Sequence, residues 1–435
     1  MTTAGDNEQA LRAHLRELEV LIGEVWESVL DQSVGVDDDF FAAGGTSIQA
    51  AMVTNRLQER LDVLLYPGAV FDAPTIAELA TYLSVHYPGL TGGGLAIEDA
   101  PKLSDVEIER GRAALDSMHT GTVGEGAKLR PAVFILAPPR SGSTLLRVML
   151  AGSPQLFSPP ELNLLHYASL AERRERLSGR SAALREGLVR AVKELRELGC
   201  EEAEALVAEL EEDGCDTREA YGMLQRWMGA RRLVEKSTTY AASVRTLRRI
   251  EALFDGARFI HLCRHPIATA LSYEEVRADL VTGVSPAGFP ASRRRQGELR
   301  WLISHSNILE FFAEVPRSRR HRLRYEDLVE DPAGAVDELG RFLDLPGDDT
   351  AAMLQPYTGA RMTDGLRPAS RMMGDPKFHR FQAIDAGNAE RWRHEIRRDF
   401  LCEQSWELAE RLGYPRDALA QAEGLDDEER EEWEF

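Results

Sequence analysis

The stretch that decides the fold is "FILAPPRSGSTLLRVML", residues 134–150. It begins as an apolar run typical of a buried parallel strand, passes through a basic loop rich in hydroxyl groups, and ends in a helical pattern. A strand, loop and helix in this order point several backbone N–H groups at one place, which favours an anionic ligand. Arg140 adds a forked positive charge to the loop. The Gly-Lys pair of the G-x-x-x-x-G-K-[ST] sequence is absent, which disfavours ATP hydrolysis.

Composition indicates a soluble globular protein with two or three domains in 435 residues. Acidic residues outnumber basic ones, 72 to 52, and this net charge of −20 disfavours nucleic acid or an anionic membrane as the main partner. The four cysteines form no C-x-x-C pair, so we expect neither a disulfide framework nor a metal site. The sequence shows no signal peptide and no apolar stretch long enough to span a membrane. We therefore expect a cytoplasmic protein.

Two later segments repeat the alternation of strand and helix. "RRLVEKSTTYA" predicts a second strand that ends at Lys236, and "ARFIHLCRHPIATALSY" predicts a third strand followed by a loop and a helix. Arg264 lies in that loop and Ser272 eight residues later in the helix, so both side chains could converge on one phosphate. Residues 165–230, between the first and second strands, have a helical pattern and are expected to cap the acceptor site or simply to pack beside it.

A separate helical module precedes these segments. In "DDFFAAGGTSIQAA", a Gly-Gly pair precedes Ser47 at a predicted helix N-terminus, where the hydroxyl could be modified by a phosphodiester or could merely cap the helix. Together with "VFDAPTIAELATYL" further on, this segment resembles the phosphopantetheine carrier proteins of nonribosomal peptide and polyketide synthases. The resemblance implies a four-helix bundle over residues 8–88. It also implies a 4′-phosphopantetheine arm on Ser47, attached by a phosphopantetheinyl transferase.

Gly, Pro and Thr dominate residues 89–130, which we expect to form a flexible linker around one short helix at about residues 103–117. At the other end of the chain, residues 421–435 form an acidic tail that we expect to be solvated.

Four motifs between residues 131 and 420, "PPRSGSTLLRVML", "RFIHLCRHPIATALSY", "RLRYEDLVEDP" and "GDPKFHRF", together resemble the sulfotransferases that use PAPS, 3′-phosphoadenosine-5′-phosphosulfate. The resemblance implies a P-loop-type α/β fold with a central parallel sheet, PAPS as donor and PAP as product. The residues that it assigns to the 5′-phosphosulfate are Arg140, Ser141, Gly142, Ser143, Thr144 and Leu145. It assigns Arg264 and Ser272 to the 3′-phosphate, and Lys377 to a late loop over the nucleotide.

Sulfuryl transfer requires stabilisation of the leaving oxygen and a base at the acceptor hydroxyl. Arg140 and Lys236 are the candidates for the first role. For the second, Glu161 matches the catalytic glutamate of tyrosylprotein-type sulfotransferases by its position 21 residues after Arg140. His305 lies in a helix similar to the histidine-bearing helix of polyketide-synthase sulfotransferase domains. Which of Glu161 and His305 is the base, and which one orients it, stays open.

The fusion of a carrier to a sulfotransferase resembles the arrangement in certain polyketide synthases, where the β-hydroxyl of a carrier-bound acyl chain is sulfated. The resemblance implies upstream synthase modules as partners. Elimination of the sulfate would need a separate thioesterase, because the chain has no G-x-S-x-G motif. The alternatives are a different acceptor such as a peptide or glycolipid hydroxyl, a catalytically silent delivery module, and a nucleotide kinase.

Overall fold

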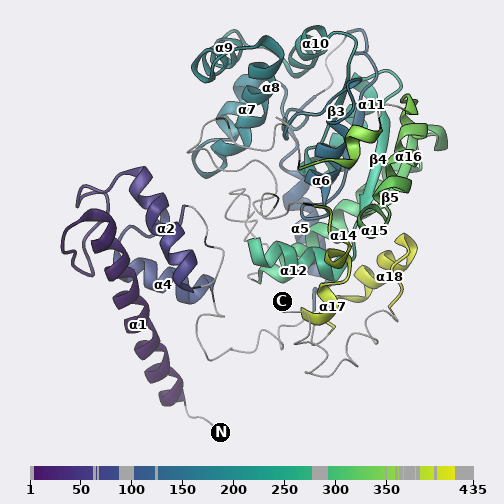
Figure 1. Cartoon of the computed structure of the whole chain (residues 1–435). Helices are drawn as coiled ribbons and strands as arrows, with labels where there is room; N and C mark the ends of the chain where they lie inside the picture. Colours follow the sequence, from purple (N-terminus) through teal and green to yellow (C-terminus); the bar gives the residue numbers. More distant parts are fainter. Residues whose placement is uncertain are drawn as a thin grey trace. The chain divides into compact units, whose positions relative to one another are not determined.

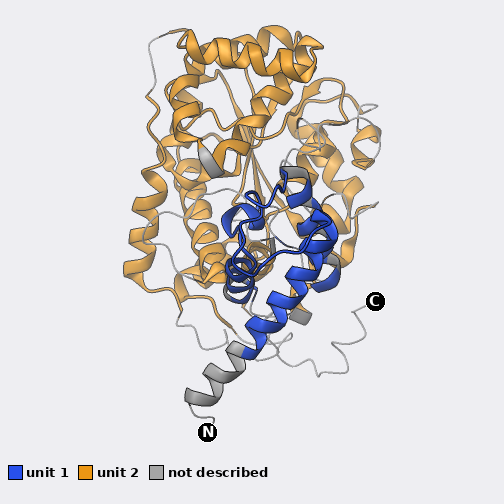
Figure 2. Ribbon diagram, turned by 90° about the vertical axis from the view of Figure 1, so that its left-hand side faces the viewer, with its two compact units in different colours: residues 1–100 blue, residues 101–435 orange. Residues whose placement is uncertain are grey.

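The structure, a computed structural model, describes residues 4–61, 65, 68–87, 102–122, 126–276, 292–347, 350–357, 361, 366, 378, 383–395 and 399–416. The chain divides into two compact units, Met1–Ala100 and Pro101–Phe435 (Figure 2).

Unit 1 is the small all-helical bundle that the sequence predicted. Its helices are α1 (Ala4–Leu30), α2 (Ser47–Leu61), the short α3 (Ala69–Asp72) and α4 (Ile76–His86). Trp26 and Phe40 meet edge to face in its core at 4.8 Å between ring centroids. A Cβ on Gly45 would lie 2.4 Å from the Phe40 ring, so the second glycine before Ser47 is required by packing.

Unit 2 is built on a five-stranded parallel sheet, as predicted. Its strands are β1 (Val133–Leu136), β2 (Leu156–Phe157), β3 (Arg232–Glu235), β4 (Arg258–Cys263) and β5 (Arg320–Arg324), in the order β2-β3-β1-β4-β5. The sequence predicted β1, β3 and β4 from their apolar runs. It did not predict β2, which has two residues, or β5, whose sequence RHRLR is basic and half-exposed at the sheet edge.

Helices cover both faces of this sheet, and alternate strand residues divide between the two cores. Phe134 and Phe259 pack with Phe311 in one core, whereas Ile135 and Ile260 belong to the other. The helices around the sheet are α6 (Ser143–Leu150), α11 (Val244–Leu253), α12 (Pro266–Val276), α14 (Arg293–Phe312), α15 (Tyr325–Glu330), α16 (Pro332–Leu343), α17 (Trp392–Glu395) and α18 (Glu403–Leu412). The 3-10 helices are η4 (Thr238–Ala242), η5 (Arg317–Arg319), η7 (Ala351–Leu354) and η9 (Ala386–Ala389).

The predicted helical insertion between β1 and β3 is present. It comprises α7 (Leu170–Arg176), η3 (Gly179–Arg185), α8 (Glu186–Arg196), α9 (Cys200–Glu212) and α10 (Thr217–Trp227). Figure 1 shows these helices gathered at one end of unit 2. Its role as a cap over an acceptor stays a prediction.

Part of the predicted linker is not a linker. Residues 102–122 belong to unit 2, where α5 (Asp105–Asp116) places Ile108 and Leu115 in a core shared with α14. A Cβ on Gly111 would lie 2.5 Å from Leu299, which shows how closely the two helices approach. The apolar side of this helix, which the Gly-rich flanks concealed, fixes it to the unit. Residues 89–101 and 123–125 of the predicted linker, and the acidic tail, lie outside the described residues.

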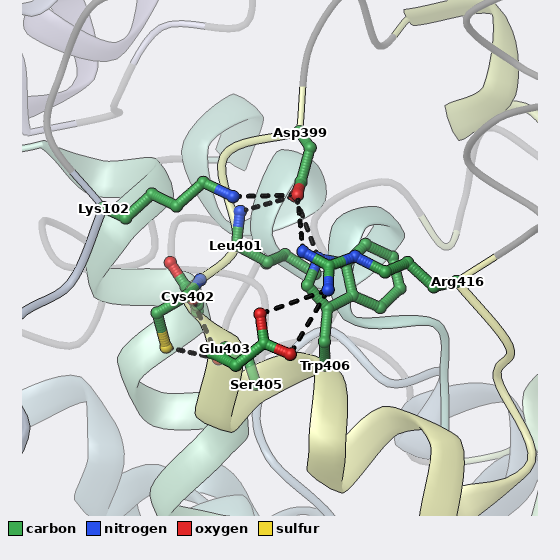
Figure 3. Close-up of polar contacts among 9 residues, drawn as sticks. Lys102, Asp399, Leu401, Cys402, Glu403, Ser405, Trp406 and Arg416 are labelled. Atoms are coloured by element: carbon green, nitrogen blue, oxygen red, sulfur yellow. Dashed lines mark hydrogen bonds and ion pairs between the residues drawn. The ribbon is translucent and has the colours of Figure 1, made fainter.

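The start of this segment is anchored to the C-terminal part of the unit (Figure 3). Lys102 Nζ lies 2.8 Å from Asp399 Oδ2, and the other oxygen of Asp399 accepts hydrogen bonds from the Leu401 N–H and the Trp406 indole. Arg416 also reaches Asp399, at 3.4 Å. The carboxylate of Asp399 thus joins the two ends of the unit's described chain.

Among the described helices, none combines the length and apolarity needed to cross a membrane.

Candidate active site

The carboxyl ends of all five strands of the sheet carry polar or aromatic side chains. Because the strands are parallel, these ends lie at one edge, which is where α/β sheets bind ligands. The residues that follow the strands in this way are Arg140 after β1, Glu161 after β2, Lys236 after β3, Arg264 after β4 and Tyr325 after β5. This edge is the candidate active site.

The loop between β1 and α6 has a strained backbone. Arg140 has φ +70° and Gly142 has φ +83°, and for Arg140 such a conformation is costly. Ser141 is fully buried, and its Oγ has no hydrogen-bond partner among the described residues. Ser143 and Thr144 open α6 with buried side chains, whereas the Leu145 side chain packs in the core, so that only its backbone can face a ligand. An unsatisfied hydroxyl beside a helix N-terminus fits an anionic ligand with several acceptor oxygens.

The Tyr325 ring fixes this loop from the side. A Cβ on Gly142 would lie 2.2 Å from Tyr325 Cδ2, so only glycine fits. Gly142→Ala is expected to lower the free energy of unfolding by about 2–4 kcal/mol, because it combines a left-handed alanine with overpacking. Thermal denaturation measures this effect.

The matched control is Gly256→Ala, since Gly256 has φ +60° but nothing within 4 Å of an added Cβ. It carries the backbone strain alone, about 1 kcal/mol. Equal losses in the two variants would contradict the close contact between Gly142 and Tyr325.

Arg140 contacts both Arg264 and Ser272, the two residues that the sequence assigned to one phosphate. Arg140 Nε donates to Ser272 Oγ at 3.2 Å, and Arg264 Nη1 donates to the Arg140 carbonyl at 3.0 Å. The Arg264 guanidinium lies 4.6 Å from the centroid of the Tyr325 ring, and its buried Nε has no partner among the described residues. Two guanidinium groups and a hydroxyl thus converge beside the loop, a set that fits phosphate oxygens.

The backbone around Arg264 is held from two elements. The Trp301 indole of α14 donates to the Arg264 carbonyl at 2.9 Å, and the His265 N–H donates to Glu326 Oε1 at 2.9 Å. Sequence reasoning missed Tyr325, Glu326 and Trp301. The motif RLRYEDLVEDP, which contains the first two, was the available signal.

Lys236 and Glu161 form an ion pair at the same edge. Lys236 Nζ lies 2.6 Å from Glu161 Oε1, and Thr238 Oγ1 lies 3.4 Å from the same oxygen. The Lys236 side chain is buried, whereas Glu161 retains partial exposure. The pair forms because β2 and β3 are neighbours in the sheet and their carboxyl ends adjoin.

His305 does not join this pair. Its ring is fully buried on α14, where Nδ1 lies 2.8 Å from His261 Nε2 and the Trp301 ring packs at 4.8 Å between centroids. Burial holds the pKa of His305 well below its usual range. Its Nε2 has no partner among the described residues.

His261, Cys263 and His305 place possible ligand atoms within 4.8 Å of one another. The 2.8 Å between the two ring nitrogens is a hydrogen-bond distance, shorter than the roughly 3.3 Å between two nitrogens of a tetrahedral zinc site. Burial also raises the pKa of the Cys263 thiol, which opposes the thiolate that a metal requires. We interpret the three residues as a buried polar cluster.

Two predicted site residues cannot be placed. Lys377 lies outside the described residues, and of Ser47 the structure describes the backbone, as the first residue of α2.

Comparison with known proteins gives matches for both units of the chain. The model of the sulfotransferase family matches residues 131–349, and that of the phosphopantetheine attachment site matches residues 21–83. The solved sulfotransferase domain from the curacin biosynthetic pathway is 38% identical, with a TM-score of 0.61 over 66% of this chain and 99% of that domain. The sulfotransferase domain of the Synechococcus PCC 7002 olefin synthase is 36% identical, with a TM-score of 0.60 over 68% and 98%.

The relatives of unit 1 are large synthases. Tyrocidine synthase 3 of Brevibacillus parabrevis is 43% identical over 76 residues, which are 17% of this chain and 1% of the synthase. Surfactin synthase subunit 3 of Bacillus subtilis (strain 168) is 36% identical over 84 residues, 19% of this chain and 6% of the subunit. The chain therefore spans only a small part of the length of these synthases.

The chain belongs to the sulfotransferase family. More particularly, it joins a phosphopantetheine carrier domain to a sulfotransferase domain that resembles those of the curacin and olefin synthase pathways.

Proposed function

We propose that the chain transfers a sulfuryl group from PAPS to the β-hydroxyl of an acyl chain carried on a 4′-phosphopantetheine arm at Ser47. The observation that carries this proposal is the Lys236–Glu161 ion pair at the sheet edge that also holds Arg140 and Arg264. A cation for the leaving oxygen and a carboxylate for the acceptor proton then lie side by side. A delivery module without activity would not need a buried lysine in this place.

Each residue has a distinct role in the proposed reaction. Arg264 and Ser272 bind the 3′-phosphate, and the loop from Arg140 to Leu145 binds the phosphosulfate. Glu161 accepts the proton of the acceptor hydroxyl as the new O–S bond forms. The bridging S–O bond breaks with its electron pair on the 5′-phosphate of PAP, where Arg140 and Lys236 stabilise the charge.

The proposed reaction requires two partners. A phosphopantetheinyl transferase attaches the arm, and upstream synthase modules supply the acyl chain. Any later elimination of the sulfate would need a third partner, a separate thioesterase. A peptidyl chain bound to the arm as a thioester would be a second type of acceptor, provided that it carries a hydroxyl group within reach.

Intact-protein mass spectrometry tests this proposal. The chain is loaded with a 3-hydroxyacyl phosphopantetheine and incubated with PAPS, and a gain of about 80 Da, the mass of SO₃, is expected on the arm. PAPS binding without this gain would direct the search to an acceptor that is not tethered. Absence of both binding and transfer would overturn the proposal, and binding of ATP in preference to PAPS would favour a kinase.

We favour Glu161 over His305 as the base because Glu161 is partly exposed and contacts Lys236. Glu161→Gln is expected to lower kcat by about 10²-fold while the affinity for PAP stays unchanged, since only the proton acceptor is lost. Single-turnover transfer and calorimetric binding of PAP measure the two quantities.

His305→Asn is the comparison, because it keeps a hydrogen-bonding side chain in the buried site beside His261. We expect a smaller loss of kcat in this variant, together with a lower melting temperature. A larger loss of kcat than in Glu161→Gln, at an unchanged melting temperature, would transfer the role of base to His305.

A further inference from the structure

Glu235, the last residue of β3, places a buried carboxyl group directly before Lys236 in the sequence. Its side chain is 1% exposed. The groups that face it are hydroxyls: Ser237 Oγ donates to Oε1 at 2.6 Å, Tyr240 OH donates to Oε1 at 3.1 Å, and Tyr221 OH donates to Oε2 at 3.2 Å. The Leu162 N–H is a further donor to it. A buried carboxylate is costly, so its place in the fold calls for an explanation.

Two of these hydroxyls also hold the loop that follows Glu161. Ser237 Oγ accepts the Asn163 N–H at 3.0 Å. Tyr240 OH accepts the Leu164 N–H at 2.8 Å and the Leu165 N–H at 3.3 Å. Each hydroxyl therefore accepts hydrogen bonding from the loop N–H side and donates its own hydrogen bond to Glu235.

The loop N–H groups, a hydroxyl and Glu235 form two hydrogen-bond relays, one through Ser237 and one through Tyr240. The carboxylate fixes the direction of the hydrogen bonds in both. A hydroxyl group has one proton and two lone pairs, and an ionised carboxylate can only accept. With the protons of Ser237 and Tyr240 directed at Glu235, their lone pairs are left for the loop. Because the Leu164 and Leu165 N–H groups occupy both lone pairs of Tyr240, a side chain that donated to Tyr240 in place of Glu235 would displace one of these N–H groups.

The loop contains one left-handed residue and is held from several sides. Asn163 has φ +49°, a conformation that asparagine adopts at less cost than most other non-glycine residues. Arg173 of α7 holds the opposite side of the loop, where its Nε donates to the carbonyls of Leu162 at 3.1 Å and Asn163 at 3.2 Å. A Cβ on Gly187 of α8 would lie 2.0 Å from the Glu161 carbonyl, so the loop is also confined against the helical insertion.

We propose that Glu235 is a positioning residue of the sulfotransferase site, which holds the Glu161 loop through Ser237 and Tyr240 so that Glu161 stays at Lys236. This inference rests on the proposed function, in which Glu161 is the base. It assigns no contact with substrate to Glu235.

The ionisation of Glu235 supports this role. Burial raises the pKa of Glu235 to about 7, against the opposing effect of its hydroxyl donors. Arg173 of α7 and Arg249 of α11 are charged groups near the cluster, and both interact electrostatically with Tyr240. His166 packs on Tyr240 at 5.3 Å, but burial lowers its pKa to about 3, so it stays neutral in this range. Protonation below about pH 7 adds a donor to Glu235 and thereby weakens the relays.

The test compares Glu235→Gln and Tyr240→Phe with Tyr221→Phe in the full chain. Tyr221→Phe is the comparison, because the Tyr221 hydroxyl donates to the same carboxylate at Oε2 and lies 3.2 Å from Tyr240 OH, but accepts none of the loop N–H groups named above. Hydrogen exchange of the Asn163–Leu165 amides is followed by mass spectrometry, and kcat with the 3-hydroxyacyl carrier and PAPS is followed from pH 5.5 to 9. Binding of PAP reports whether the donor loop is intact.

We expect exchange about tenfold faster in Glu235→Gln and Tyr240→Phe, the effect of losing roughly one hydrogen bond, and near wild-type exchange in Tyr221→Phe. In the wild type kcat should rise with pH through about 7. In Glu235→Gln it should be about tenfold lower and lack this rise, with PAP binding unchanged.

Wild-type exchange in Glu235→Gln would overturn the inference, as would faster exchange with an unaltered kcat profile. If even the wild type transfers no sulfate, the proposed function fails and the positioning role fails with it. The exchange data would still show whether Glu235 holds the loop, so the two failures are distinguishable.

Discussion

Arg140→Ala is expected to lower kcat for sulfuryl transfer by about 10³-fold, because a charge that stabilises the leaving oxygen is lost. The effect is electrostatic, since alanine keeps the Cβ and hence the backbone strain already present at φ +70°. The loss of the hydrogen bond to Ser272 is also expected to weaken PAP binding. Single-turnover transfer, calorimetry with PAP and thermal denaturation measure the three consequences.

The control for charge removal is Arg248→Ala, since Arg248 is exposed and forms ion pairs with Glu310 and Glu314. It should retain full transfer, because exposed ion pairs contribute little to stability. Transfer within tenfold of wild type in Arg140→Ala would contradict the assignment of this loop to the phosphosulfate.

Ser47→Ala is expected to abolish attachment of the phosphopantetheine arm and with it all carrier-bound sulfation, because the hydroxyl oxygen forms the phosphodiester bond. The helix should persist, since alanine is favourable in helices and Ser47 is the first residue of α2. Incubation with a phosphopantetheinyl transferase and coenzyme A, followed by intact mass measurement, gives the result directly.

Thr46→Ala removes the neighbouring hydroxyl and is the matched variant. Thr46 is exposed, and its Oγ1 accepts from the Gln49 N–H at 3.3 Å, as a residue does at a helix start. This variant should accept the arm normally. Addition of the arm to Ser47→Ala would show that another residue is the attachment site, and the same sample tests PAPS binding independently.

The sequence predicts the central strands of the sheet and misses the edge strands. The apolar runs of β1, β3 and β4 are buried central strands, and their pattern is sufficient to predict them. The edge strands β2 and β5 are defined by hydrogen bonds to these neighbours, since neither has an apolar run of useful length. Residues 102–122 were assigned to the linker because the Gly-rich flanks masked the apolar face of α5.

The site shows the same division. Motif order assigned Arg140, Arg264 and Ser272 to one nucleotide site, which stays a prediction, and in the structure Arg140 contacts both other residues. The pairing of Glu161 with Lys236, which are 75 residues apart, depends on the adjacency of β2 and β3, which no local pattern encodes. The buried hydroxyls around Glu235 likewise come from α10 and from the segment that follows β3, and their contact with the loop after Glu161 is long-range, so their common role was not visible in the sequence.

The anchoring of Lys102 at Asp399 determines where a sulfotransferase module of this kind can be cut from its neighbours. An excision that began at residue 131 would discard α5 and expose Leu299 and Trp301, which share its core. The Trp301 indole also supports the carbonyl of Arg264, so a shortened module would lose order at its donor site as well as stability. Because Lys102 and Arg416 both contact Asp399, the first and last described residues of the module lie close together. A domain whose two ends lie close together can be inserted into a longer multidomain protein, or removed from it, without separation of those ends.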